Sequence, residues 1–143
     1  VYGPRQDQHA VYSGVIPIML NKIDTGTPPT INGDGSQAYD FVYVDDAARS
    51  NVLALQSAAT DVFCNVGTGI QTTIRELCDN ILELKQSDLK VTYKPYDADD
   101  ARRLVQNRIG CSKKAKQDLA FEYEIDLRQG LQDLVAWRAE RKA

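Results

Sequence analysis

The chain has 143 residues, of which 43% are hydrophobic and 26% charged, and its formal net charge is −3. This length suits one domain with a buried core, and the charge argues against nucleic acid or an anionic membrane as the default partner. No apolar run approaches the roughly 18 residues of a membrane-spanning helix, and no signal peptide is predicted, so we expect a cytoplasmic protein.

The first third of the chain predicts a helix, a turn-rich segment and a strand. Apolar residues at helical spacing predict a helix over residues 11–23. The segment 25–37 is rich in Gly, Pro, Asn and Asp, which favours turns, with a short strand at 29–32. β-Branched and aromatic residues then predict a strand over residues 40–44.

A second helix is expected to follow and to end near Ser57. Asp45 and Asp46 could act as a general acid and base, but helix capping explains two adjacent carboxylates at this place more simply. The periodicity predicts a buried side for this helix that consists of Ala48, Val52, Leu53 and Leu55.

The rest of the chain continues the alternation of strands and helices. Thr73 and Glu76 have the spacing of a capping box, which predicts a helix to about Lys85, and Asp126 is expected to cap the last helix. The remaining predicted elements are strands over 62–66 and 89–95 and a short basic helix over 113–119. Together these elements predict a single α/β unit over residues 1–143.

The residues alone reveal no catalytic set and no metal site. The only histidine, His9, lies in a polar segment, and the three cysteines (Cys64, Cys78 and Cys111) lack metal-ligand spacing, so we expect reduced thiols packed as small hydrophobic side chains. The GTG at 67–69 lacks the third glycine and the distant acidic residue of a dinucleotide fingerprint. It is expected to be a turn that aims the next helix.

Five stretches, taken in order, resemble one family. They are YGPRQ at 2–6, YSGVIPIML at 12–20, PPTINGDGSQAYDFVYVDDAARSNVLAL at 28–55, FCNVGTG at 63–69 and GLQDLVAW at 130–137. The order resembles the extended short-chain dehydrogenases/reductases, and more narrowly the NAD-dependent nucleotide-sugar epimerases and dehydratases, which include UDP-glucose 4-epimerase. The alternative is an unrelated α/β binding domain. It would have to match all five stretches in this order by accident, which argues against it.

The resemblance implies which part of such an enzyme this chain represents. We expect the C-terminal substrate-binding subdomain plus the last strands and helices of a Rossmann-type domain, with the N-terminal NAD-binding half missing. The opening VYGPRQ then resembles a cut end inside the parent fold. The family's glycine-rich NAD loop and its Tyr-x-x-x-Lys pair are absent from the sequence, so this chain is expected to carry no catalytic residue and to bind no NAD alone.

The resemblance also assigns binding residues one by one. The backbone of Tyr2, Gly3 and Pro4 is expected near the nicotinamide end of NAD. A helix start that faces the sugar diphosphate corresponds to Ser13, Gly14 and Val15, and a strand that lines the nucleotide base corresponds to Thr30, Ile31 and Asn32.

Tyr39 departs from the family pattern, because many members have a diphosphate-binding Arg at this place. A tyrosine can donate a hydrogen bond but brings no charge, and it can equally pack as a strand aromatic. Arg102 lies close to the place of a second phosphate-binding arginine, with Arg103 and Arg108 as neighbours. A further departure is Ala120, where a Gly is common, which predicts either a negative φ or backbone strain.

Two functions remain open from the sequence. The chain is either the nucleotide-sugar-binding portion of an NAD-dependent epimerase or dehydratase, with a UDP-sugar as ligand, or a stand-alone truncated gene product that self-associates as a binding or assembly module. Apolar helix faces and sheet edges left without the rest of the fold favour association, so we expect a homodimer or another homo-oligomer.

Overall fold

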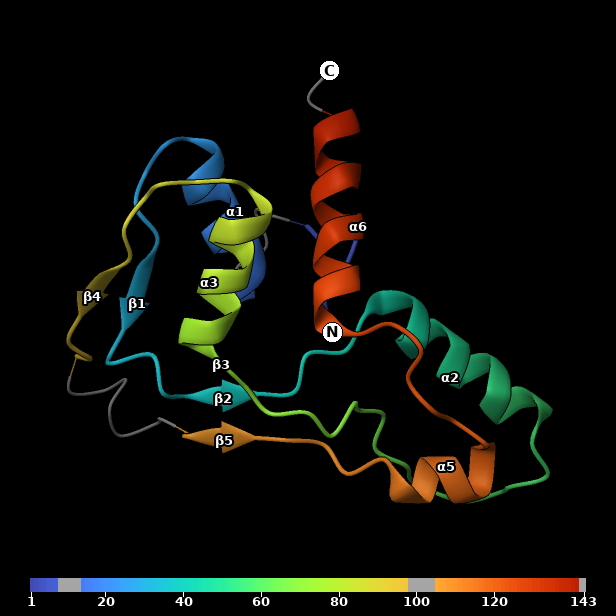
Figure 1. Cartoon of the computed structure of the whole chain (residues 1–143). Coiled ribbons are helices and arrows are strands. Elements are labelled where there is room, and N and C mark those ends of the chain that lie inside the picture. Colours follow the sequence, from blue (N-terminus) through green and yellow to red (C-terminus); the bar gives the residue numbers. More distant parts are fainter. Residues whose placement is uncertain (8–13, 98–104, 142–143) are drawn as a thin grey trace. The chain divides into compact units, whose positions relative to one another are not determined.

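The computed structural model describes residues 1–7, 14–97 and 105–141 (Figure 1). The chain divides into two compact units: unit 1 contains Val1–Pro4, Asp40–Gln71 and Ile109–Ala143, and unit 2 contains Arg5–Tyr39 and Thr72–Arg108. The sequence predicted one unit over 1–143. Local patterns do not reveal the division, because each unit is assembled from stretches that are distant in the sequence.

Unit 2 is built around two packed helices, α1 (Val15–Asp24) and α3 (Ile74–Leu84). The capping box of α3 is present as predicted: Glu76 N–H donates to Thr73 Oγ1 over 3.1 Å, and Thr73 N–H donates to Glu76 Oε2 over 2.8 Å. An ion pair between Lys85 and Asp24 joins the far ends of the two helices. Their buried apolar side chains are Ile16, Met19, Leu20, Ile23, Ile74, Leu77, Cys78 and Ile81.

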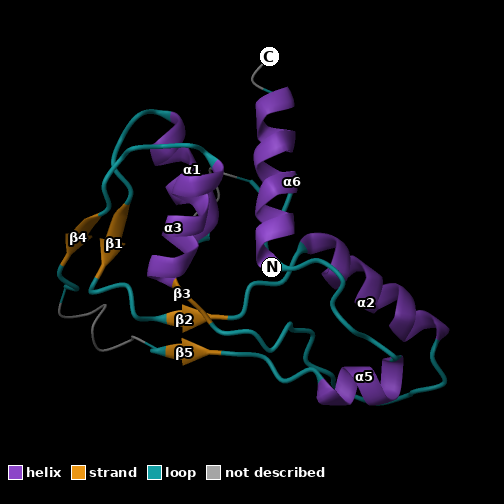
Figure 2. Cartoon of the chain, in the orientation of Figure 1, coloured by secondary structure: helices purple, strands orange, loops and turns teal. Residues whose placement is uncertain are grey.

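Two small sheets complete unit 2 (Figure 2). Strand β1 (Thr30–Asn32) pairs in parallel with β4 (Thr92–Lys94). In the second sheet the central strand β2 (Ala38–Tyr39) runs antiparallel to β3 (Thr72–Thr73) and parallel to β5 (Asn107–Arg108). Strands β1 and β4 confirm the predictions at 29–32 and 89–95 with shorter bounds.

Unit 1 contains three helices, α2 (Val44–Gln56), α5 (Lys113–Leu119) and α6 (Leu127–Glu140). Both α5 and the Asp126 cap of α6 agree with the sequence prediction, since the Asp126 carboxylate accepts the Gln129 N–H over 2.8 Å. The buried apolar side chains of unit 1 are Tyr2, Val42, Tyr43, Ala115, Phe121, Leu131 and Leu134.

Two predicted strands do not form. Within 40–44 the structure has a single bridge, between Tyr43 and Tyr2, and residues 62–66 are in no strand. β-Branched composition marks a segment as able to pair, but a ladder also needs a neighbouring strand with free backbone groups. Both predictions were therefore wrong for the part of the chain that the structure describes.

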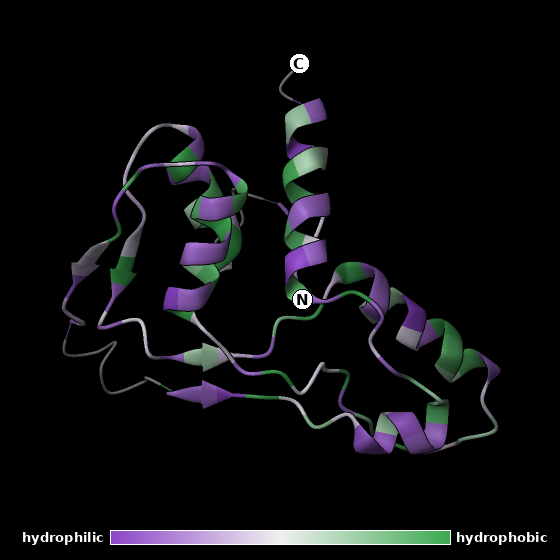
Figure 3. Ribbon diagram, viewed as in Figure 1, coloured by the Kyte–Doolittle hydropathy of each residue, from purple (hydrophilic) through white to green (hydrophobic). Residues whose placement is uncertain are grey.

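The predicted start and buried side of α2 were also wrong. Its N-cap is Tyr43, with no side-chain capping bond, so Asp45 and Asp46 lie within the first turn. Asp46 is buried and accepts backbone N–H groups of Glu124 and Ile125, at 2.9 and 3.0 Å. The apolar stripe of α2 is largely exposed, and Figure 3 shows hydrophobic residues in its last turns. Periodicity identifies an apolar face but not what covers it.

Within the described residues, no helix has the length and apolar character needed to cross a membrane.

Candidate functional site

Strand β1 carries three of the predicted site residues, and all of them lie in unit 2. Ile31 is 1% exposed and anchors the strand, whereas Asn32 is exposed. The Thr30 hydroxyl is held from two sides, because it accepts from Lys22 Nζ at 2.7 Å and lies 3.0 Å from Thr92 Oγ1. The strand is thus fixed by α1 and β4 through Thr30, which leaves Asn32 at its exposed end.

The turn after β1 is shaped by hydrogen bonds of its own. The Asp34 carboxylate accepts from the Ser36 hydroxyl at 2.6 Å and from its backbone N–H at 2.9 Å. These two bonds stabilise the charged carboxylate and hold the pKa of Asp34 below its usual value. Gly33 N–H donates to Lys94 O over 2.8 Å, so the turn continues the pairing of β1 with β4.

Tyr39 and Arg108 are brought together by the second sheet. They are register partners in the parallel pair of β2 with β5. Register partners on neighbouring strands present their side chains to the same face. Tyr39 is half-buried and Arg108 is exposed. Arg108 therefore lies next to Tyr39, the position at which many family members have an arginine.

The start of α1 includes two further predicted residues. Gly14 is its N-cap and is exposed, and among the described residues no side chain makes a capping hydrogen bond there. The first turn contains no acidic residue, so no side chain of that turn offsets the positive end of the helix dipole. Val15 is half-buried at the first helical position. Ser13, Arg102 and Arg103 lie outside the described residues.

The predicted NAD-contacting residues Tyr2, Gly3 and Pro4 lie in unit 1, and Pro4 is half-buried. Tyr2 and Gly3 are buried. Tyr2 N–H donates to Val42 O at 2.9 Å, its carbonyl accepts from Val44 N–H at 2.8 Å, and its hydroxyl donates to Leu127 O at 3.2 Å. Burial, with neighbouring Tyr43 and carboxylates, raises the pKa of Tyr2 above its usual value. The backbone of Tyr2 is therefore engaged within the protein.

Asp40 is a residue whose role the sequence did not reveal. Its carboxylate accepts four hydrogen bonds in unit 1: from the Thr68 N–H (3.0 Å) and hydroxyl (2.6 Å), the Gly69 N–H (3.0 Å) and the Gly110 N–H (3.2 Å). A Cβ atom on Gly67 would lie 2.6 Å from Asp40 Oδ2, so this approach requires glycine. The GTG turn thus serves as a cradle for a carboxylate of the protein itself.

The described cysteines and carboxylates form no group that could hold a metal ion. Cys78 is buried as expected, and burial raises the pKa of its thiol to about 11. The expectation of packed thiols was wrong for Cys111, which is exposed, and only partly met by Cys64, which is half-buried.

Comparison with known proteins identifies relatives of this arrangement. The family model of the NAD dependent epimerase/dehydratase family matches residues 1–67. A UDP-glucose 4-epimerase of Mycolicibacterium smegmatis is 34% identical over 131 residues, which cover 92% of this chain and 40% of that protein. The chain spans about two fifths of the length of the curated relatives that it matches.

Solved structures show the same similarity in three dimensions. A UDP-glucose 4-epimerase of Thermotoga maritima, solved with UDP-glucose, is 34% identical with a TM-score of 0.90 and aligns over 99% of this chain and 44% of its own. A UDP-N-acetylglucosamine 4-epimerase of Methanobrevibacter ruminantium, solved with UDP-N-acetylmuramic acid, is 30% identical with a TM-score of 0.87 and aligns over 98% and 44%.

The comparisons correct the predicted fold class. We expected the C-terminal, substrate-binding part of a Rossmann-type enzyme. The family-model match over residues 1–67, taken with the alignments to solved structures, points instead to the N-terminal Rossmann NAD-binding part, so that assignment was wrong. Short motifs in the right order identify a family, but they do not fix which part of its fold a chain represents. With its motifs, its α/β elements and these alignments in agreement, the chain belongs to the NAD-dependent epimerase/dehydratase family.

Proposed function

We propose that this chain contributes nucleotide-sugar binding to an NAD-dependent epimerase or dehydratase, with a UDP-sugar as the ligand. The observation that carries the proposal is the pairing of Tyr39 with Arg108 in the sheet of unit 2. A sugar diphosphate is an anion, and a guanidinium group binds phosphate oxygens through charge-assisted hydrogen bonds. Arg108 supplies the cation that Tyr39 does not.

The other parts of unit 2 have assigned roles in the same proposal. Strand β1, with Thr30, Ile31 and Asn32, lines the nucleotide base. The N-terminus of α1, at Gly14 and Val15, offers N–H groups to the diphosphate. Arg102, Arg103 and Ser13 belong to the proposal by resemblance.

The proposal assigns no catalytic residue to this chain. The family is NAD-dependent, and NAD would supply hydride transfer in a whole enzyme. The predicted nicotinamide contacts are backbone groups of residues 2–4, and those of Tyr2 are already hydrogen-bonded within unit 1. Although the comparisons point to the NAD-binding part of the family fold, these backbone groups are already engaged, so we propose that this chain alone binds a nucleotide-sugar and neither binds NAD nor turns the sugar over.

A second candidate function is self-association as a binding or assembly module. It is favoured by large apolar side chains on the surface of unit 1: Leu55 is 87% exposed and Phe63 is 94% exposed. Exposed apolar side chains of this size favour contact with another protein surface.

Calorimetric titration of the chain with UDP-glucose, and separately with NAD, tests the first candidate. UDP-glucose binding is expected, and Arg108→Ala should weaken it about tenfold, which is about 1.4 kcal/mol. The matched control is Arg141→Ala, because Arg141 is an exposed arginine in unit 1, at the C-cap of α6. Binding of NAD in place of UDP-glucose, or equal affinity of Arg108→Ala and the unchanged chain, contradicts the proposal.

A further inference from the structure

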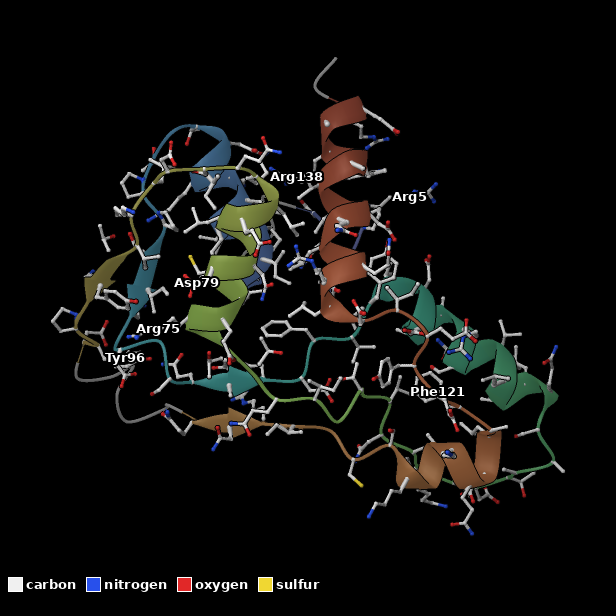
Figure 4. All side chains as sticks on the ribbon, in the orientation of Figure 1. Arg5, Arg75, Asp79, Tyr96, Phe121 and Arg138 are labelled. Carbon is white, nitrogen blue, oxygen red and sulfur yellow. The ribbon has the colours of Figure 1, made fainter. Side chains whose placement is uncertain are left out.

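Arg75 connects the first turn of α3 to two separate segments of unit 2. Its backbone N–H donates to Gly35 O at 3.1 Å, and its Nη2 donates to Asp34 O at 2.9 Å. Its guanidinium carbon lies 5.4 Å from the centre of the Tyr93 ring. Figure 4 shows Arg75 beside the turn that follows β1. One side chain thus contacts both the turn after β1 and strand β4.

These two segments flank the strand proposed to line the nucleotide base. Tyr93 is the register partner of Ile31, and Asp34 follows β1 by two residues. Each strand of this pair has three residues, and a pair this short has little stability of its own. Tyr93 is 49% exposed, so the contact with Arg75 covers only part of its ring. The position of β1 therefore depends on contacts from outside the pair.

Glycines in the turn after β1 allow Arg75 to approach it closely. Gly35 has φ of +79°, and a Cβ atom there would lie 3.2 Å from Arg75 Cβ. Glycine therefore permits both the left-handed backbone and the close approach. At Gly33 an added Cβ atom would lie 2.2 Å from the Tyr96 ring. The other end of the turn therefore also approaches a neighbouring side chain closely, here one that follows β4. Figure 4 shows Tyr96 at this end.

We propose that Arg75 is a positioning residue for nucleotide binding: it fixes the turn over residues 33–36 against β4 and so holds Thr30–Asn32 in place. The ligand-dependent part of this inference rests on the proposed function. The claim that Arg75 fixes the turn and β1 does not rest on it, because this claim concerns hydrogen bonds within unit 2. We call it the mechanical part of the inference. Arginine suits the role because its planar fork can donate to a carbonyl while its face covers an aromatic ring.

Amide hydrogen exchange tests the mechanical part, because it measures how well the pairing of β1 with β4 is held. In Arg75→Ala the N–H of Gly33, which bonds Lys94 O, and the N–H of Thr92, which bonds Pro29 O, should exchange at least about tenfold faster. Arg75→Lys keeps the charge and a donor but loses the planar face, so it should restore part of the protection. Arg141→Ala removes an arginine from an aromatic ring, Trp137, in unit 1 and should change neither amide. Unchanged exchange in Arg75→Ala overturns the inference.

Nitrogen-15 NMR during a UDP-glucose titration tests the ligand-dependent part, because it measures whether β1 responds to the nucleotide-sugar. In Arg75→Ala the shift changes at Thr30–Asn32 should be lost while those at Arg108 remain, with the urea midpoint of unfolding lowered only slightly. Equal shift changes at Thr30–Asn32 in both proteins overturn a positioning role even if exchange is faster. If the unchanged chain binds no UDP-glucose, the proposed function fails, and the exchange rates alone decide whether Arg75 fixes the strand.

Discussion

At the level of single residues, the Asp40 carboxylate stands out because it accepts four hydrogen bonds within unit 1. We predict that Asp40→Asn lowers the free energy of unfolding by about 2–3 kcal/mol, because an amide replaces a charged acceptor and turns an NH2 group toward N–H donors. Urea denaturation measures the change. The control is Asp45→Asn, an exposed carboxylate in α2, which should cost less than about 1 kcal/mol. Equal effects of the two substitutions would contradict the role of Asp40.

The sequence left open whether Ala120 has a negative φ or a strained backbone. Its φ is 54°, so the backbone is left-handed and the residue is strained, rather than holding a negative φ. Ala120→Gly should therefore raise the free energy of unfolding by about 0.5–1 kcal/mol. The control is Ala136→Gly, at an exposed position inside α6, which should lower it by a similar amount. A loss of stability in Ala120→Gly would show that this turn is not strained.

At the scale of elements, the capping box of α3 predicts a dependence on pH. Hydrogen bonds from the Thr73 N–H and hydroxyl lower the pKa of Glu76. A carboxylate whose pKa is lowered on folding stabilises the protein above its unfolded pKa of about 4.3, and this contribution is lost as pH falls through the lower folded value. Urea unfolding at pH 7 and in steps below pH 4.5 should show the loss.

Two variants isolate the capping box from other carboxylates. Thr73→Ala should cost about 1 kcal/mol at pH 7. Glu76→Gln should flatten the acid dependence, whereas Asp79→Asn, on the exposed side of the same helix, should leave it unchanged. The account of this helix start is contradicted if Glu76→Gln and the unchanged chain lose stability in parallel.

The elements also show what sequence patterns can and cannot predict. Helix α3 was predictable because its cap and its apolar face lie within the same dozen residues. The contacts of Asp40 were not, since its donors lie 28 to 70 residues away. The strand predictions over 40–44 and 62–66 failed for the same reason: pairing depends on distant backbone. In the candidate site, the family resemblance predicted Thr30–Asn32 and named Arg108 only as a neighbour of Arg102. The β2–β5 register then placed Arg108 beside Tyr39.

At the scale of the whole molecule, the exposed apolar side chains of unit 1 predict association. Light scattering across a concentration series should give more than the monomer mass, and Leu55→Ser with Phe63→Ser should lower it toward the monomer. Ile18→Ser changes an exposed apolar residue of α1 in unit 2 and should have no effect. A monodisperse monomer at every concentration would contradict the prediction.

Nitrogen-15 NMR of the unchanged chain during a UDP-glucose titration shows whether unit 2 binds a nucleotide-sugar. We expect saturable shift changes at the amides of Thr30–Asn32, Tyr39 and Arg108, and none of comparable size when NAD is added instead. Shift changes confined to unit 1, or no changes at saturating UDP-glucose, would contradict nucleotide-sugar binding by unit 2.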